Sequence, residues 1–186
     1  ATATQQTGFW FVAQARPDVP DNMGILWFGV DDAATSCLTP IYCCTQGVPE
    51  CLSEGNGSML EYSPTSAFWL FNRTTNFAYM RYDMISADIR KVTDKWENDM
   101  LRNVQALNAR VGKMSPEARR SHLTQLSVET AQQLFVVRRQ FDGRRLGNGL
   151  GSELTGEVFA RTEQIADAEN QVLGFERLDD ILLSPG

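Results

Sequence analysis

The feature that most constrains the fold is a run of consecutive apolar residues from Ile25 to Val30, ILWFGV. A strand with one wet face alternates apolar and polar residues, whereas a strand buried on both faces does not. A run this short also fits part of a buried helix. Its aromatic and β-branched residues, the internal Gly29 and the stop at Asp31 favour a strand. We therefore expect a sheet that is covered by helices on both sides.

Two further extended segments flank this strand. Residues 8–15, GFWFVAQA, are rich in aromatic residues, and a connection dense in turn residues (16–22) separates them from the central run. A strand, a short turn-rich loop and a second strand most simply form an antiparallel pair. A second short apolar run, 38–42, follows the polar loop 31–36. The sequence thus places strands at about 8–44.

The rest of the chain is predicted to be mainly helical, from about residue 64 to 173. Ser63 and Pro64 are typical of an N-cap followed by the first helical position. The next helix, from Ile85 to Val111, has apolar residues every three or four positions and ends at Gly112. Another begins at residues 115–117 and runs to about 143, which predicts an antiparallel helical hairpin. A glycine-rich connector (143–151) and a last helix (157–173) complete the prediction.

The totals favour a globular protein. The chain has 186 residues, 42% of them hydrophobic, which suits one α+β domain or a large part of one. A net charge of −6 disfavours nucleic-acid binding, because a phosphate backbone attracts clustered Lys and Arg. No apolar run approaches the roughly 20 residues that span a bilayer, so no membrane association is expected. The polar start resembles a cut edge more than a signal peptide, and leaves a bacterial cytoplasmic and a periplasmic or secreted location both open.

Four cysteines lie close together in the sequence. Their spacing does not match a zinc site, and the single histidine, His122, is remote, so we expect no metal and no cofactor. We expect the four to be buried small side chains. A disulfide from Cys43 or Cys44 to Cys51 and a thiol-redox or metal module remain as alternatives.

Polar residues in two places are candidates for a site. The loop that leaves the central strand carries four of them, which also serve to turn and cap the chain: Asp31, Asp32, Thr35 and Ser36. The first helix carries polar residues that need partners, either backbone groups of the sheet or a substrate cleft: Asn72, Arg73, Asn76 and Arg81. The substrate-binding candidates among all of these are Ser36, Asn72, Asn76 and Arg81.

The order of these segments is more specific than their composition. The chain from Thr7 to about Leu107 resembles the C-terminal part of the dipeptidases of peptidase family C69, which resemble Ntn (N-terminal nucleophile) hydrolases. The most specific matching pieces are Arg16-Pro17-Asp18, Tyr42 with Val48-Pro49-Glu50, Ser63-Pro64-Thr65-Ser66-Ala67, and Asn72, Asn76-Phe77-Ala78-Tyr79 with Arg81-Tyr82. The resemblance implies the C-terminal portion of an αββα sandwich, with residues 1–186 forming a single region of a larger dipeptidase domain.

The resemblance also implies a reaction. Dipeptides would be cleaved by a cysteine at the start of the mature enzyme, with its own α-amino group as the base. This chain begins with Ala1, and none of its cysteines carries a free α-amine, so we assign no catalytic residue to it. We expect a segment that is inactive alone, whose partners are the N-terminal portion of the same enzyme and, in the full enzyme, the dipeptide substrate. An open sheet edge would then favour a homo-oligomer. The alternative is a noncatalytic helical protein-interaction domain.

Overall fold

The computed structural model describes residues 3–146. By its internal contacts the chain divides into two units, residues 1–135 and 136–186, and each is described by itself. The described part of the second unit is the end of one helix, where the Arg138 guanidinium lies 5.7 Å from the centre of the Phe141 ring. The predicted helix at 157–173 and the end of the glycine-rich connector, beyond residue 146, lie outside the described residues. The start of that connector, residues 143–146, is helical and not a loop.

Three antiparallel strands form one sheet in the order β1-β2-β3. They are β1 (Phe9–Gln14), β2 (Ile25–Val30) and β3 (Thr39–Tyr42). In the register, Phe11 lies opposite Phe28, and Phe28 lies opposite Thr39. The predicted strands and their antiparallel pairing are confirmed, as is the α+β class.

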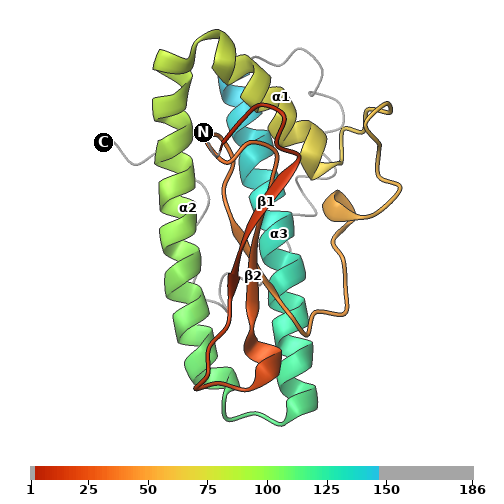
Figure 1. Ribbon diagram of the computed structural model, residues 1–186, viewed down its shortest axis with the longest axis vertical. Coiled ribbons are helices and arrows are strands. Elements are labelled where there is room, and N and C mark those ends of the chain that lie inside the picture. The colour runs from red at the N-terminus through yellow and green to blue at the C-terminus, as the bar shows by residue number, and fades with distance from the viewer. Residues whose placement is uncertain (1–2, 147–186) are drawn as a thin grey trace. The chain divides into compact units, whose positions relative to one another are not determined.

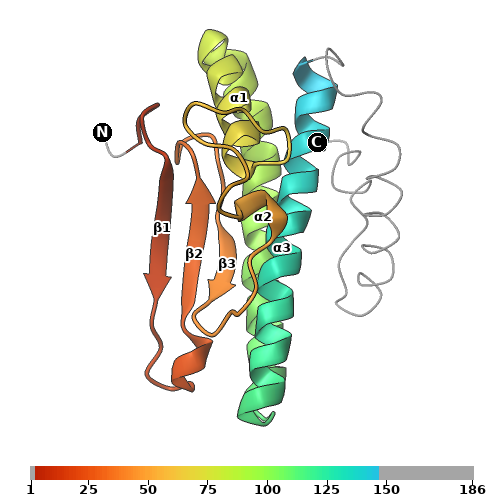
Figure 2. The same ribbon diagram turned by 90° about the vertical axis from the view of Figure 1, so that its right-hand side faces the viewer.

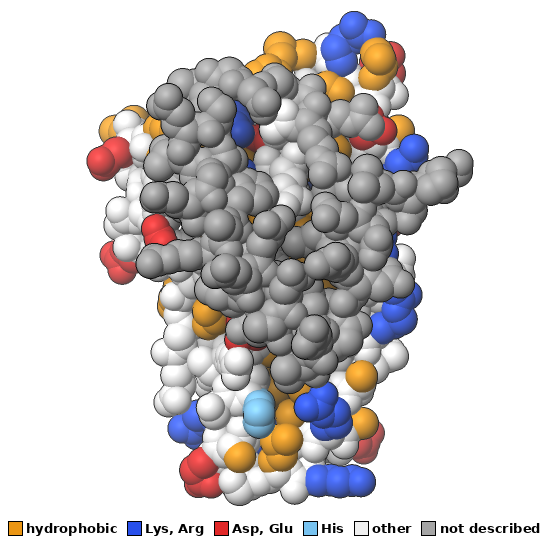
Figure 3. All heavy atoms as spheres, turned by 180° about the vertical axis from the view of Figure 1, so that it is seen from behind, with side chains coloured by type: hydrophobic (Ala, Val, Ile, Leu, Met, Phe, Trp, Pro, Cys, Tyr) orange, Lys and Arg blue, Asp and Glu red, His pale blue; other side chains and the backbone are white. Residues whose placement is uncertain are grey.

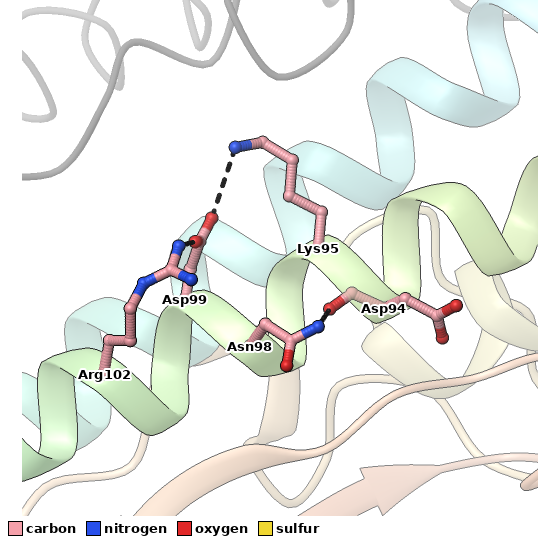
Figure 4. A network of polar contacts seen from close by, with 5 residues as sticks. All are labelled: Asp94, Lys95, Asn98, Asp99 and Arg102. Atoms are coloured by element: carbon pink, nitrogen blue, oxygen red, sulfur yellow. Dashed lines mark hydrogen bonds and ion pairs between the residues drawn. The ribbon is translucent and has the colours of Figure 1, made fainter. Parts of the chain in front are cut away.

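Three helices follow the sheet: α1 (Ala67–Met80), α2 (Tyr82–Val111) and α3 (Pro116–Leu146). Figure 1 shows α2 and α3 as the two arms of the predicted hairpin, joined by a short loop. Arg81, in a non-helical conformation, separates α1 from α2. Along α2, the half-buried Asp99 pairs with Lys95 at 3.5 Å and with the exposed Arg102, while the Asn98 amide donates to the Asp94 carbonyl (Figure 4).

The start of α1 corrects one prediction. The helix begins at Ala67 with Ser66 at the N-cap position, and not at Ser63 and Pro64. The Ser63 hydroxyl instead donates to the Asn56 side-chain oxygen at 2.5 Å and accepts the Thr65 N–H at 3.4 Å. Serine followed by proline is equally suited to a turn, and here a partner from the preceding loop favours the turn.

Helices cover one face of the sheet at β2 and β3. Ile25 and Trp27 of β2 are buried, and the Tyr42 hydroxyl at the end of β3 donates to the Asn108 side chain of α2 at 3.0 Å. The Trp96 indole of α2 also donates to the Leu38 carbonyl at 3.1 Å. Figure 2 shows the helices on the side of β3, with β1 the strand farthest from them. This face forms the core with apolar residues of α2: Ile89, Trp96, Met100 and Val104.

In the described part of the chain, helices also reach the opposite face of β2 but not β1, so the expected cover on both sides is only partial. Val30 packs against a cluster formed by Cys51, Ala67, Leu70 and Phe135. Around β1 the face is open, since Phe9 and Phe11 are 61% and 54% exposed. Consecutive apolar residues indicate that exposing either face of β2 to water is unfavourable, but they do not indicate which polypeptide packs on each face.

The outer edge of β1 is also open in the described part of the chain, because the sheet ends there. The Asp31 N–H donates to the Gly8 carbonyl at 2.8 Å, so residues 8 and 31 form a hydrogen-bonded pair. Hydrogen-bonded and non-hydrogen-bonded pairs alternate along an antiparallel ladder. The backbone groups of Phe9, Phe11 and Ala13 therefore point outward from the edge. Such an apolar edge without charge or proline is suited to pairing with another strand.

Arg119 is expected to hold the hairpin loop. Its buried guanidinium donates to the carbonyls of Val111 (3.0 Å), the last residue of α2, and of Met114 (2.9 Å) and Gly112 (3.4 Å) in the loop after it. Replacing it with methionine (Arg119→Met) keeps the aliphatic length but leaves carbonyls without a donor, and should lower the unfolding free energy by about 2 kcal/mol. Urea unfolding measures the effect. A change below about 0.5 kcal/mol would show that water replaces the guanidinium at no cost.

Candidate functional site

The loop that follows β2 is the centre of the candidate site. Asp31 is buried and has a left-handed backbone, with φ at 66°. Asp32 is also buried, and its side chain accepts the Ala34 N–H at 3.0 Å. Its carbonyl accepts the N–H groups of Thr35 (3.1 Å) and Ser36 (2.9 Å). Short polar side chains that bond the backbone two residues on are typical of tight turns, so the loop folds locally.

One face of α1 meets the first of these carboxylates. The Asn72 amide donates to Asp31 Oδ1 at 3.0 Å, and the Thr75 hydroxyl donates to Asp31 Oδ2. Because the single proton of Thr75 is used in this bond, the Thr35 hydroxyl must donate to Thr75 Oγ1, 2.7 Å away. The result is a chain of hydrogen bonds directed at a buried carboxylate.

The second carboxylate is bound by a tyrosine. The Tyr79 hydroxyl donates to Asp32 Oδ2 at 2.5 Å. This hydrogen bond, and to a smaller degree burial, raises the pKa of Tyr79 to about 12. The phenol is therefore protonated at neutral pH and acts as a hydrogen-bond donor. Its ring stacks on Tyr82, with ring centres 5.6 Å apart.

The first strand reaches the same loop through a tryptophan. The Trp10 indole donates to the Ser36 hydroxyl oxygen at 2.7 Å. It crosses the backbone of Gly29, where an added Cβ would lie 2.6 Å from the indole nitrogen. Only glycine leaves room for this crossing. The glycine in the middle of β2 thus allows β1 to hold the loop.

An apolar pocket adjoins the loop. It measures about 310 Å³, including the part open to solvent. Three of its lining residues, Val30, Cys37 and Phe71, are chain neighbours of the polar residues Asp31, Ser36 and Asn72. The hydrogen-bonded residues described above are called the polar cluster: Trp10, Asp31, Asp32, Thr35, Ser36, Asn72, Thr75 and Tyr79. The polar cluster and the pocket are therefore positioned by the same three segments.

Two of the four sequence-predicted binding residues belong to this cluster, Ser36 and Asn72. Asn76 is exposed and donates to the side-chain oxygen of Asn72 at 3.0 Å, so it extends the cluster to the surface. Arg81 is exposed, and its guanidinium contacts the Met84 sulfur instead. The cluster's polar groups bond one another and not mainly backbone groups of the sheet, which was the other expectation.

Three members of the cluster were missed: Trp10, Thr75 and Tyr79. The spacing of Asn72, Thr75 and Tyr79 is three and then four residues, which places them on one face of a helix. A polar stripe within an otherwise apolar helix was the available signal. Nothing in the sequence indicated that Trp10 reaches Ser36.

The cysteines differ from one another. None of the four is joined in a disulfide, and Cys37 and Cys51 are buried as expected. Cys43 is exposed and Cys44 is half-buried, so burial of all four is wrong. Burial raises the pKa of Cys51 to about 11, and it also raises the pKa of Cys44. A nucleophilic cysteine needs the opposite shift.

The described residues contain no group of three or more His, Cys, Asp or Glu side chains that could bind a metal ion. His122 is exposed, as the pale blue side chain in Figure 3 shows. In the same part of the chain, no helix combines the length and the apolar character needed to cross a bilayer.

Comparison with known protein families identifies the family of this chain. The family model described as Peptidase family C69 matches residues 1–95. The chain belongs to peptidase family C69. The match contains the whole sheet, the loop 31–36 and all of α1, and it ends within α2. Among curated proteins, no match was found.

Because the chain belongs to family C69, the polar cluster is part of a protein that is related to peptidases. Every described residue of the cluster lies within the matched range. Both carboxylates of the loop are buried and bonded within the protein, so they position the loop and do not reach a substrate. Of the groups on α1, the Asn76 amide is exposed, whereas Asn72 and Tyr79 are half-buried.

The variant Tyr79→Phe should show how much the hydrogen bond from the Tyr79 hydroxyl to Asp32 contributes to stability. Folding favours the protonated phenol, because its pKa rises from an ordinary value near 10 to about 12. Its contribution is complete below pH 10 and is lost as the pH rises through 12. At pH 8 the variant should be less stable by about 1.5 kcal/mol, as for a hydrogen bond to a charged group.

Urea unfolding of both proteins from pH 8 to 11.5 tests the sign. The difference between wild type and Tyr79→Phe should shrink above pH 10. Tyr82→Phe is the control, since the Tyr82 ring stacks on Tyr79 without being the donor to Asp32. A difference that stays constant with pH would contradict the assigned hydrogen bond.

Proposed function

We propose that this chain is the C-terminal part of a cysteine dipeptidase of the Ntn-hydrolase type, and that the nucleophilic cysteine lies on other polypeptide of the same enzyme. The observation that carries the proposal is the uncovered side of the sheet at β1. The family C69 match makes the chain a relative of peptidases. The finer activity, hydrolysis of dipeptides by a thiol, is our inference.

The open side of the sheet supports an αββα sandwich. Sandwiches bury the inner faces of two sheets against each other, at a separation of about 10 Å. Phe9 and Phe11 project from the open face, and Val12 on the other face of the edge strand is 51% exposed. A second sheet packed on this face would bury the two phenylalanines. The helices that pack on β2 and β3 would then supply an outer layer.

The cysteine environments support a nucleophile from elsewhere. Attack on an amide carbonyl requires a thiolate, held near a base and near fixed donors for the oxyanion. Cys51 is buried with its pKa raised, and Cys37 is buried. A cysteine inside a chain has no free α-amine to serve as its base. We therefore assign no catalytic role to the cysteines of this chain.

The polar cluster has a positioning role in this proposal. It joins the end of β2 to α1 and β1 by hydrogen bonds, and Asn76 and Tyr79 lie on the same helix as the pocket-lining Phe71. Preorganised loops at strand ends are suited to bind the polar ends of a small substrate. A dipeptide has a charged amine, a carboxylate and one peptide bond, so fixed polar groups at a strand end suit its two ends.

Dipeptide hydrolysis should therefore belong to the complete product of the gene and not to this chain alone. We expect the complete product to hydrolyse a panel of dipeptides and to lose activity on treatment with iodoacetamide. The chain by itself should be inactive. Replacing Cys43 and Cys44 with serine, and Cys37 and Cys51 with alanine, should leave turnover by the complete product within a few-fold of the wild type.

Two results would overturn the proposal. One is turnover by the chain alone that disappears with a cysteine of this chain. The other is a complete product that is folded, judged by circular dichroism, but hydrolyses no dipeptide. A monomeric chain that binds a protein partner through α2 and α3 would then favour the noncatalytic interaction domain.

A further inference from the structure

The two adjacent cysteines occupy the tip of a tight turn. Cys43 and Cys44 follow the last residue of β3, and the Thr45 N–H donates to the Tyr42 carbonyl at 2.9 Å. This bond makes them the two central residues of a β-turn. Cys43 is exposed and Cys44 is half-buried, so solvent reaches the turn.

The backbone around the turn is fixed on the side of Cys43. Its N–H donates to the Gly24 carbonyl at 2.9 Å. Its sulfur lies against Gly24, only 3.1 Å from where a Cβ would be added there. The absence of a side chain at residue 24 thus leaves room for the thiol beside the turn.

The two thiols differ in environment. Partial burial is the main cause that raises the pKa of Cys44, and the positive charge of Arg120 opposes it. Arg119 acts in the same direction as Arg120 but more weakly. The pair therefore combines an exposed thiol with one that is partly shielded and near positive charge.

A direct disulfide does not suit this pair. Adjacent Cα atoms are about 3.8 Å apart, whereas disulfides usually join Cα atoms about 4.4–6.8 Å apart. A single larger atom bonded to both sulfurs relaxes this requirement, because the sulfurs need not touch. Thiolates are soft ligands and prefer soft, thiophilic centres.

We propose that the Cys43–Cys44 turn is a dithiol site that captures trivalent arsenicals. With an aryl arsenoxide, two arsenic–sulfur bonds form and the arsenic–oxygen bond breaks. The oxygen leaves as water together with the two thiol protons. Arsenic stays trivalent and the sulfurs are not oxidised, so the reaction needs no oxidant or reductant.

Phenylarsine oxide and the full 186-residue chain, reduced and freed of reductant, provide the test. Intact-mass spectrometry should show one adduct per chain at equimolar reagent. The adduct should survive excess 2-mercaptoethanol, a monothiol, and be removed by 2,3-dimercaptopropanol, a dithiol. Cys43→Ser and Cys44→Ser should each reduce the adduct at least tenfold.

The matched control is the double variant Cys37→Ser with Cys51→Ser, which removes the two buried thiols and should keep the adduct. Circular dichroism of each variant shows that the fold is intact, and the wild-type chain serves as a test that does not depend on any variant. No adduct on the wild-type chain overturns the proposal. So does an adduct that persists in either turn variant, or one that is lost in a folded control.

Discussion

Asp31→Ala is expected to lower the free energy of unfolding by about 4 kcal/mol. The carboxylate is buried and accepts hydrogen bonds from Asn72 and Thr75, and its removal leaves both donors without their partner. Two such losses together cost about 3 kcal/mol. Alanine at φ of 66° adds about 1 kcal/mol of backbone strain. Urea unfolding at pH 7 measures the total.

Two further variants separate these causes. Asp31→Gly loses the same hydrogen bonds but tolerates the left-handed backbone, so it should be about 1 kcal/mol more stable than Asp31→Ala. Asp31→Asn keeps one acceptor and suits the same backbone, so it should be the most stable of the three. Equal stability of the alanine and glycine variants would show that the backbone of Asp31 is not strained.

Gly29→Ala is expected to cost about 3 kcal/mol. The new methyl group would lie 2.6 Å from the Trp10 indole nitrogen and 3.1 Å from the Cys37 carbonyl oxygen. Overpacking of this kind costs about 1–3 kcal/mol, and a displaced indole also loses its bond to Ser36, worth about 1 kcal/mol. Urea unfolding, with tryptophan fluorescence as the signal, measures both the stability and the displacement.

A double-mutant cycle with Trp10→Ala tests the cause. Once the indole is gone, the same Gly29→Ala change should cost only about 1 kcal/mol, because the nearest clash has been removed. Trp10→Phe is a milder control that keeps an aromatic ring but removes the donor to Ser36. If Gly29→Ala costs the same with and without Trp10, the crossing of the indole is not what requires glycine.

The strands and helices could be predicted because their signals are local. The apolar run at Ile25–Val30, the turn-rich connection before it and the helical periodicity up to Gly112 each depend on neighbouring residues. The start of α1 was misplaced because Ser63 and Pro64 are suited to both a turn and a helix start. The choice depends on Asn56, a partner from the preceding loop that the local pattern does not include.

The candidate site was only partly predictable, because its contacts join distant segments. Asp31 and Ser36 were candidates since they follow a strand, and Asn72 because it interrupts an apolar helix. Their partners Thr75 and Trp10 come from α1 and β1, and only the register of the strands and the rotation of the helix bring them together. The exposure of Phe9 and Phe11 could not be predicted either, since an apolar pattern does not show which polypeptide, if any, packs on those residues.

The most direct test of our account is amide hydrogen exchange at β1, read at Phe9, Phe11 and Ala13, whose backbone groups point outward from the sheet edge. In this chain alone, these amides should exchange quickly, while those of Trp10 and Val12 are protected by β2. In the complete product of the gene, all five should be protected, because the remaining polypeptide of the enzyme covers the edge and the open face. Equally fast exchange at Phe9, Phe11 and Ala13 in both proteins would contradict the account.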